Sequence, residues 1–231
     1  MSLDAAIRLT EVLLSIALIQ QSLEHIFGLP EERIHYLVRL FLAALLVPGI
    51  QSQWICVGLF VNALFILNRF QGPYNGGSDL LSLLLIFCLG LAHMMPNTLW
   101  QEYVFGYLAL QVTFSYFKSG WAKVVHRDWR SGRALEDVFA FSAYPVSEAT
   151  RAWAAWPRLL CTMSWAVILF ELLFPLAFIT PVALIAGLTI ALVFHVANFY
   201  LFGFNRFVWV WVAAFPSLLW LQARLNPLDW I

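Results

Sequence analysis

The sequence predicts an all-α fold, a polytopic integral membrane helical bundle of about eight transmembrane helices. Hydrophobic residues make up 62% of the 231 residues and charged residues only 11%, whereas soluble domains carry about 25% charged residues. Apolar stretches of roughly 20 residues recur along the chain, which is the length a helix needs to cross a bilayer. The abundant Trp and Tyr residues suit the aromatic belts at the two membrane faces.

Eight apolar segments are predicted to form the transmembrane helices, and Gly and Pro residues separate most of them, as at Gly72-Pro73, Pro96 and Pro181. Their ranges are 5–26, 34–50, 52–69, 78–95, 98–121, 158–179, 181–202 and 205–223. The chain shows no repeat and no low-complexity run. We therefore expect one transmembrane domain over residues 1–231 and no soluble domain.

The fifth and sixth segments are joined by the one long connection, residues 122–157. A short helix is expected from Arg133 to Phe141 within it. A second short helix is expected from Ser147 to Trp156, because Ser147 and Glu148 resemble an N-cap and the first turn that follows it.

Loop charges predict the orientation. In the eight-helix arrangement, Arg33, Arg69, Arg206 and the seven basic residues between Lys118 and Arg158 lie on one side of the membrane. Arg8 and Arg224 lie on the other. Since cytoplasmic loops carry the excess of Lys and Arg, the 122–157 connection is predicted to be cytoplasmic. The 13 basic and 13 acidic residues leave no net charge to attract nucleic acid.

The segment YFKSGWAKVVHRDWRSG, residues 116–132, carries the main functional candidate, Lys123. An ionisable group at the end of an apolar helix needs a partner, a wet cavity or a function. Tyr116 lies two helical turns before Lys123 and shares its face, and Gly120 allows a helix or ligand to approach that face closely. Such a lysine can act as a base. It can also snorkel toward a phosphate or pair with Asp128, so both roles stay open.

Two further polar residues fall inside apolar segments. Glu171, in WAVILFELLFPLAF, must be paired or protonated, and a lysine or histidine is its natural partner. His195 lies in the middle of a helix, and Asn198 follows on the same face. A bond from His195 to a neighbouring helix and a contact with a ligand are the two alternatives.

The turn from Asn75 to Asp79 is predicted to begin a helix, with Ser78 or Asp79 capping its free amides. A helix start of this kind can also hold an anion or a carbonyl oxygen, so Asn75 and Asp79 are candidate ligand-binding residues. Trp129, in the Trp-x-x-Gly turn that follows Lys123, is a further candidate. No zinc, nucleotide or c-type haem motif is present, and no metal ligands are predicted.

Four segments together resemble the HTTM domain, the membrane portion of the vitamin K-dependent gamma-carboxylase and of its bacterial relatives. The most specific, at 116–135, matches YF-x-[AS]-G-x-x-K-[LV] followed by DW-x-x-G-x-[AS]-[LM]. The other three are NGGSDLLSLLLIF at 75–87, FELLFPLAFI at 170–179 and FHVANFYLFGFNRFVWVWVAAFP at 194–216. Order and spacing also match, over most of the chain from Arg69 onward.

The resemblance implies an activity and a cofactor. In the carboxylase, the lysine of this signature is the base that deprotonates vitamin K hydroquinone. Oxygenation of the hydroquinone then yields a strong base that removes a glutamate γ-proton, and CO2 captures the carbanion. Carried over, the lysine's role falls on Lys123, with a reduced quinone as the implied cofactor. Gly77 stands where the carboxylase has an active-site histidine, so this part of the pattern differs.

Three functions therefore remain open from the sequence. The first is a lysine-assisted, quinone-dependent membrane oxidoreductase or carboxylase-like lyase of the bacterial inner membrane, in which Glu171 and His195 tune or orient Lys123. The second is a subunit that binds a quinone or lipid without chemistry of its own and serves a membrane or soluble partner protein. The third is a scaffold subunit, in which Asp128, Trp129 and Gly132 fix the fold of the long connection.

Overall fold

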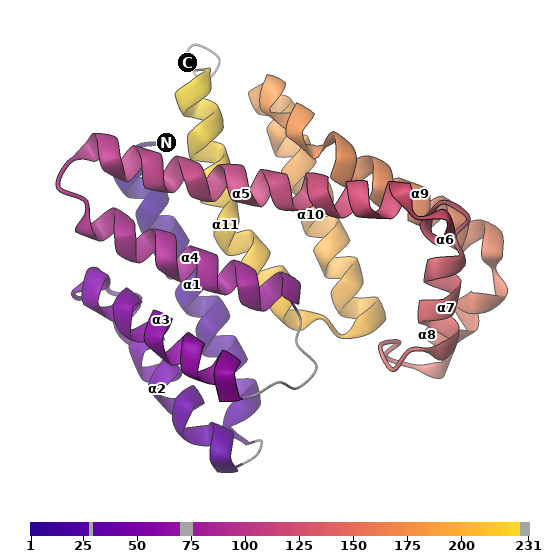
Figure 1. The fold of residues 1–231 in the computed structure, drawn as a ribbon, viewed down its shortest axis with the longest axis horizontal. Helices are drawn as coiled ribbons and strands as arrows, with labels where there is room; N and C mark the ends of the chain where they lie inside the picture. The colour runs from indigo at the N-terminus through magenta and orange to yellow at the C-terminus, as the bar shows by residue number, and fades with distance from the viewer. Residues whose placement is uncertain (28–29, 70–75, 227–231) are drawn as a thin grey trace. The chain divides into compact units, whose positions relative to one another are not determined.

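The computed structural model describes residues 1–27, 30–69 and 76–226, and these residues are helical throughout, with turns but without a strand (Figure 1). The helices are α1 Leu3–Ile26, α2 Pro30–Leu46, α3 Ser52–Arg69, α4 Gly76–Met94, α5 Thr98–Val125, α6 Arg127–Arg130, α7 Arg133–Phe141, α8 Glu148–Arg151, η1 Ala152–Ala155, α9 Pro157–Leu173, η2 Phe174–Ile179, α10 Pro181–Phe202 and α11 Asn205–Leu225. The prediction of an all-α fold is confirmed.

Four helical stretches in the described part of the chain are long and apolar enough to cross a membrane. They are Gly77–Met94, Pro157–Ile179, Pro181–Phe202 and Asn205–Leu225. Ser52–Asn68 is apolar but shorter. These long apolar helices indicate a membrane-embedded protein. The count of eight spans stays a prediction, since α1, α2 and α5 are not among the four.

The helix ends agree closely with the expected segments in the second half of the chain. The 181–202 segment is α10, the 133–141 helix is α7, and Ser147 caps α8 by accepting a hydrogen bond from the Thr150 amide at 3.1 Å. Two helices differ more. α2 spans Pro30–Leu46 where 34–50 was predicted, and α5 continues to Val125, beyond the predicted end at residue 121. Lys123 therefore lies in the last turn of α5, on the face that it was expected to share with Tyr116.

The chain forms two compact units. Unit 1 comprises Met1–Leu110 with Trp209–Arg224, and unit 2 comprises Gln111–Val208 with Leu225–Ile231. The prediction of a single domain stays a prediction, and each unit is described by itself.

Unit 1 pairs α1 with α2, α2 with α3 and α3 with α4. A group of polar side chains around Glu11 connects helices of this unit, and the Glu11 side chain is only 1% exposed. Arg8 donates to that carboxylate at 2.7 Å and to the Leu46 carbonyl at 3.1 Å, and His93 of α4 bonds the other carboxylate oxygen. Because each charge has a partner, the cost of burying Glu11 is offset within the unit.

Unit 2 contains the end of α5, the connection, α9, η2 and α10. The connection packs back onto the end of α10, where the Val146 amide donates to the Leu201 carbonyl at 3.2 Å and the Phe139 ring lies 5.1 Å from that of Phe202. Phe139 is fully buried and also stacks on Trp153 at 5.9 Å. The 122–157 connection is thus an ordered helical layer with a small core of its own.

Candidate functional site

Lys123 lies in the last turn of α5 and forms a buried ion pair with Glu171 of α9. The Lys123 Nζ atom donates to the two Glu171 oxygens at 2.6 and 2.8 Å, and the two side chains are 16% and 4% exposed. The carboxylate partner of Lys123 is therefore Glu171 and not Asp128, and the ammonium is not free in solvent. The sequence expected a lysine or histidine beside Glu171, and the structure supplies the lysine.

Ser119 completes this ion pair. It precedes Lys123 by one helical turn, so both side chains share a face of α5. Its Oγ atom accepts from the Lys123 Nζ at 2.7 Å and donates to Glu171 Oε1 at 3.2 Å. Three polar groups thus satisfy one another in an apolar environment, which is the condition for burying a charge pair at moderate cost.

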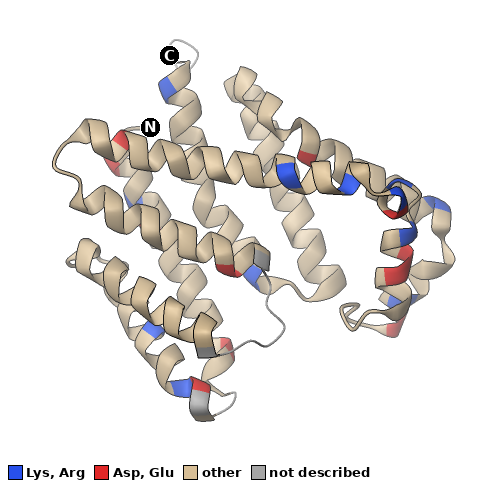
Figure 2. Ribbon diagram, in the orientation of Figure 1, with Lys and Arg blue, Asp and Glu red and all other residues tan. Residues whose placement is uncertain are grey.

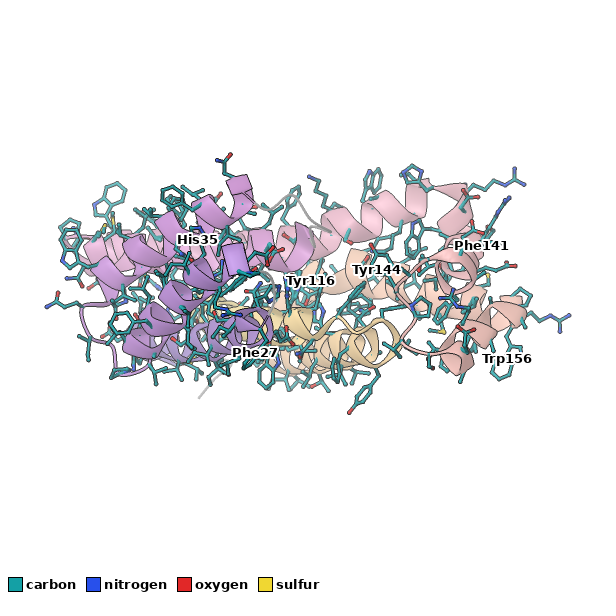
Figure 3. The ribbon with its side chains drawn as sticks, turned by 90° about the horizontal axis from the view of Figure 1, so that it is seen from below. Phe27, His35, Tyr116, Phe141, Tyr144 and Trp156 are labelled. Carbon is teal, nitrogen blue, oxygen red and sulfur yellow. The ribbon has the colours of Figure 1, made fainter. Side chains whose placement is uncertain are left out.

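A second polar couple lies one turn further back along α5. The Tyr116 hydroxyl and His195 Nε2 are 2.9 Å apart, and both residues are almost completely buried. Aromatic rings surround them: the Tyr116 ring lies 4.2 Å from that of Phe174 and 5.4 Å from that of Phe170, and the His195 ring lies 5.1 Å from that of Phe194. Figure 3 shows Tyr116 in the interior of the ribbon. The predicted contact of His195 with a neighbouring helix is present, and its partner is Tyr116.

Gly120 explains how α5 and α9 come close enough for these bonds. A Cβ atom at Gly120 would lie 2.7 Å from the Leu172 amide nitrogen and 2.9 Å from the Glu171 Cβ atom, closer than real Cβ atoms approach. Gly120 therefore admits the backbone of a helix, one of the two alternatives that the sequence left open.

The turn that follows Lys123 also packs against α9. Gly132 has a φ of +83°, and a Cβ atom there would lie 2.6 Å from the Cys161 Cα atom. The Trp129 carbonyl accepts from Ser164 Oγ at 2.5 Å, and the Arg130 carbonyl accepts from Trp165 Nε1 at 2.9 Å. From Gly120 to Gly132 the chain thus runs antiparallel along α9.

Trp129 itself reaches the ion pair. The Lys123 Nζ atom lies 5.3 Å from the centroid of the Trp129 ring, within the range of a cation–π interaction. Trp129 is thus both part of the turn and part of the site.

Two predicted site residues in the described part of the chain have other partners. The Asn198 amide donates to the Phe194 carbonyl of its own helix at 3.0 Å. Asp79 belongs to unit 1, where the Gln21 amide donates to it at 3.3 Å. Because α4 begins at Gly76, Asp79 lies inside the first turn of the helix and not at the cap. Asn75 lies outside the described residues.

Sequence reasoning missed Ser119, Ser164 and Trp165. The spacing of four between Ser119 and Lys123 was a usable signal, because residues four apart share a helix face. Ser164 and Trp165 gave no such signal, since their partners are backbone carbonyls. Glu11 and His93 were also not paired in the sequence analysis, because 82 positions separate them.

The arrangement offers a primary amine, a carboxylate, a phenol and an imidazole on neighbouring turns inside an apolar unit. These groups can hold and pass protons, and they can hydrogen-bond the oxygens of a flat aromatic ligand. Within residues 1–27, 30–69 and 76–226, no three His, Cys, Asp or Glu side chains are placed to hold a metal ion. No protein-family model, curated protein or solved structure matches the chain.

Proposed function

We propose that this is a multi-pass integral membrane protein of the HTTM and gamma-carboxylase-like type, whose unit 2 site binds a quinone-like or lipid ligand and uses Lys123 in proton-abstraction or redox chemistry. The observation that carries the proposal is the pair of polar couples, Lys123 with Glu171 and Tyr116 with His195. Tyr116 and Lys123 lie two turns apart on one face of α5, and both couples lie in an apolar and aromatic environment. A membrane protein retains such groups at a cost, which is the usual mark of a functional site.

The side chains of the site are of the types that bind a reduced quinone. Tyr116 and His195 provide hydrogen-bonding groups for ring oxygens, and Phe170, Phe174 and Trp129 provide flat apolar surfaces. A bound quinol would supply the two electrons of the reaction. In the proposal, Lys123 reacts as the neutral amine and accepts a proton at Nζ, the ion pair with Glu171 is the protonated state that results, and the tight α5–α9 contact excludes water.

The placement in the membrane is part of the same proposal. The four apolar helices support a membrane-embedded chain. The apolar segments of the sequence favour about eight spans, and with eight spans the distribution of Lys and Arg favours a cytoplasmic 122–157 connection. The resemblance to bacterial HTTM members favours the bacterial inner membrane.

Mass spectrometry of the protein after mild detergent extraction tests ligand binding. We expect a quinone or another apolar molecule to co-purify with the wild-type protein, and a preparation free of any such molecule would contradict the proposal. Oxidation of added vitamin K hydroquinone under oxygen, followed spectroscopically, tests for chemistry.

The variant Lys123→Arg separates the two roles of the amine. Arginine keeps the positive charge beside Glu171 but does not give up its proton near neutral pH. We expect Lys123→Arg to stay folded and to keep its ligand while losing hydroquinone oxidation. Unchanged oxidation in this variant would exclude Lys123 as the base.

A non-catalytic role is the second candidate, as a ligand-binding or scaffold subunit that serves a membrane or soluble partner protein. The observation that favours it is the dense set of contacts along α9, where Gly120, Gly132 and the Trp129 carbonyl all meet this helix. This function predicts that wild type and Lys123→Arg both lack hydroquinone oxidation. It also predicts that Trp129→Ala destabilises the protein more than Lys123→Arg does.

A further inference from the structure

Four arginines gather where the connection meets α9. Arg127 and Arg130 lie on α6, Arg133 begins α7, and Arg158 lies in the first turn of α9. Figure 2 shows these basic positions around α6 and the neighbouring helix starts, whereas α10 carries no charged residue. All four side chains are exposed. We call this group the arginine cluster.

The cluster has spare positive charge. Within the described part of the chain, Arg127 and Arg158 have no carboxylate partner, and Arg130 donates only to the Val124 carbonyl, at 2.9 Å. Arg133 approaches Asp137 at 3.8 Å, in a pair that is more than half exposed. Counting Asp128, Glu136 and Asp137 of the same segment against the four arginines leaves one positive charge unbalanced.

The scaffold under the cluster is fixed. Gly132 packs on the Cys161 backbone, and the Arg130 carbonyl accepts from Trp165 Nε1. These contacts hold α6 against the start of α9, so Arg130 and Arg158 stay near each other although 28 positions separate them in the sequence. An exposed array of guanidinium groups on a fixed backbone is suited to bidentate binding of phosphate oxygens.

Exposed tryptophans beside the arginine cluster indicate its depth relative to the membrane. Trp156, directly before α9, is 58% exposed and lies at the edge of the ribbon in Figure 3, and Trp165 is 37% exposed. Trp beside Arg at the start of a spanning helix is the pattern of the membrane–water interface, at the level of the lipid headgroups.

We propose that the arginine cluster binds the phosphate headgroup of an anionic phospholipid in the leaflet that faces the 122–157 connection. The inference rests on the proposed membrane placement and not on the ligand of Lys123. The spare charge selects an anionic lipid over a zwitterionic one, and the exposed Trp156 ring packs beside the glycerol region. Each arginine near such a headgroup contributes about fivefold in affinity.

The test counts bound lipids by native mass spectrometry while detergent-solubilised protein is titrated with phosphatidylglycerol or phosphatidylcholine. Wild-type protein is expected to bind phosphatidylglycerol preferentially. The triple variant R127Q/R130Q/R158Q is expected to lose at least about tenfold of that preference. The matched control Arg224→Gln removes one exposed arginine of unit 1 that pairs with Glu102, and it is expected to bind like wild type.

Two further variants serve as controls in the lipid titration. The variant R127K/R130K/R158K retains the charge and guards against misfolding, so it should keep most of the preference. Lys123→Arg should leave it unchanged, which separates this site from the proposed ligand site. Equal binding of the two lipids by wild type, an unchanged preference in the glutamine variant, or full displacement by millimolar inorganic phosphate would each overturn the proposal.

Discussion

The coupling between Lys123 and Glu171 can be measured with a double-mutant cycle. Lys123→Met removes the ammonium and leaves the Glu171 carboxylate, 4% exposed, with Ser119 as its remaining donor. Breaking a buried pair from one side costs about 3–5 kcal/mol. Because Lys123 keeps 16% exposure, we expect the lower end, about 3 kcal/mol, for the loss in unfolding free energy.

The reverse variant should cost less. Glu171→Leu leaves the ammonium at the end of α5, where its long side chain can turn toward solvent, and we expect a loss of about 2 kcal/mol. The double variant K123M/E171L leaves no unpaired charge but removes both partners of Ser119, and it should lose about 2 kcal/mol. The coupling energy is then about 3 kcal/mol.

Guanidinium unfolding in detergent, followed by Trp fluorescence and circular dichroism, gives these four free energies. Lys118→Met is the matched control, since Lys118 is exposed on the same helix and should change stability by less than about 0.5 kcal/mol. If Lys123→Met costs no more than Lys118→Met, or if the two single changes simply add, the ion pair does not stabilise unit 2 as argued.

Three other predictions follow from particular contacts, each checked by thermal unfolding in detergent. Gly132→Ala should lose more than about 2 kcal/mol of unfolding free energy, because Gly132 has a positive φ and an added Cβ atom would lie 2.6 Å from Cys161. At Gly106 an added Cβ atom would lie 3.8 Å from the nearest atom, so Gly106→Ala should be neutral or stabilising. Equal effects of the two substitutions would contradict the packing argument. Glu11→Leu should lose about 3 kcal/mol by leaving Arg8 and His93 without their shared carboxylate, and a loss below about 1 kcal/mol would mean that the bonds to Glu11 add little to the stability of unit 1. Ser147→Ala should lose about 1 kcal/mol by removing the cap of α8, and an unchanged transition would show that this cap contributes nothing measurable.

The sequence predicted the elements well where local signals determine them. Apolar runs bounded by Gly and Pro fixed α10, and the cap at Ser147 fixed the start of α8. The end of α5 was predicted too early, because the polar residues after Gly120 resemble a connection. Lys123 has its partner on α9, and the helix continues to Val125.

The site was predictable in its chemistry and only in part in its geometry. A buried carboxylate must have a partner, so a lysine or histidine beside Glu171 followed from the sequence. That the partner is Lys123, and that His195 meets Tyr116, depends on how α9 and α10 pack on α5. Spacing along one helix cannot give this. Asn198 shows the same limit: it shares a helix with His195, yet its amide bonds its own backbone.

Residues 120–132 run antiparallel along α9, so the polar connection belongs to the same structural unit as the candidate site. Gly120 packs on Leu172 at one end of this segment, Gly132 packs on Cys161 at the other, and Lys123 bonds Glu171 between them. A change in the α6 turn would therefore alter the depth at which Lys123 is held against α9. Arg127 and Arg130 of the arginine cluster lie on that turn. The two proposed sites share this scaffold although they bind different chemical groups.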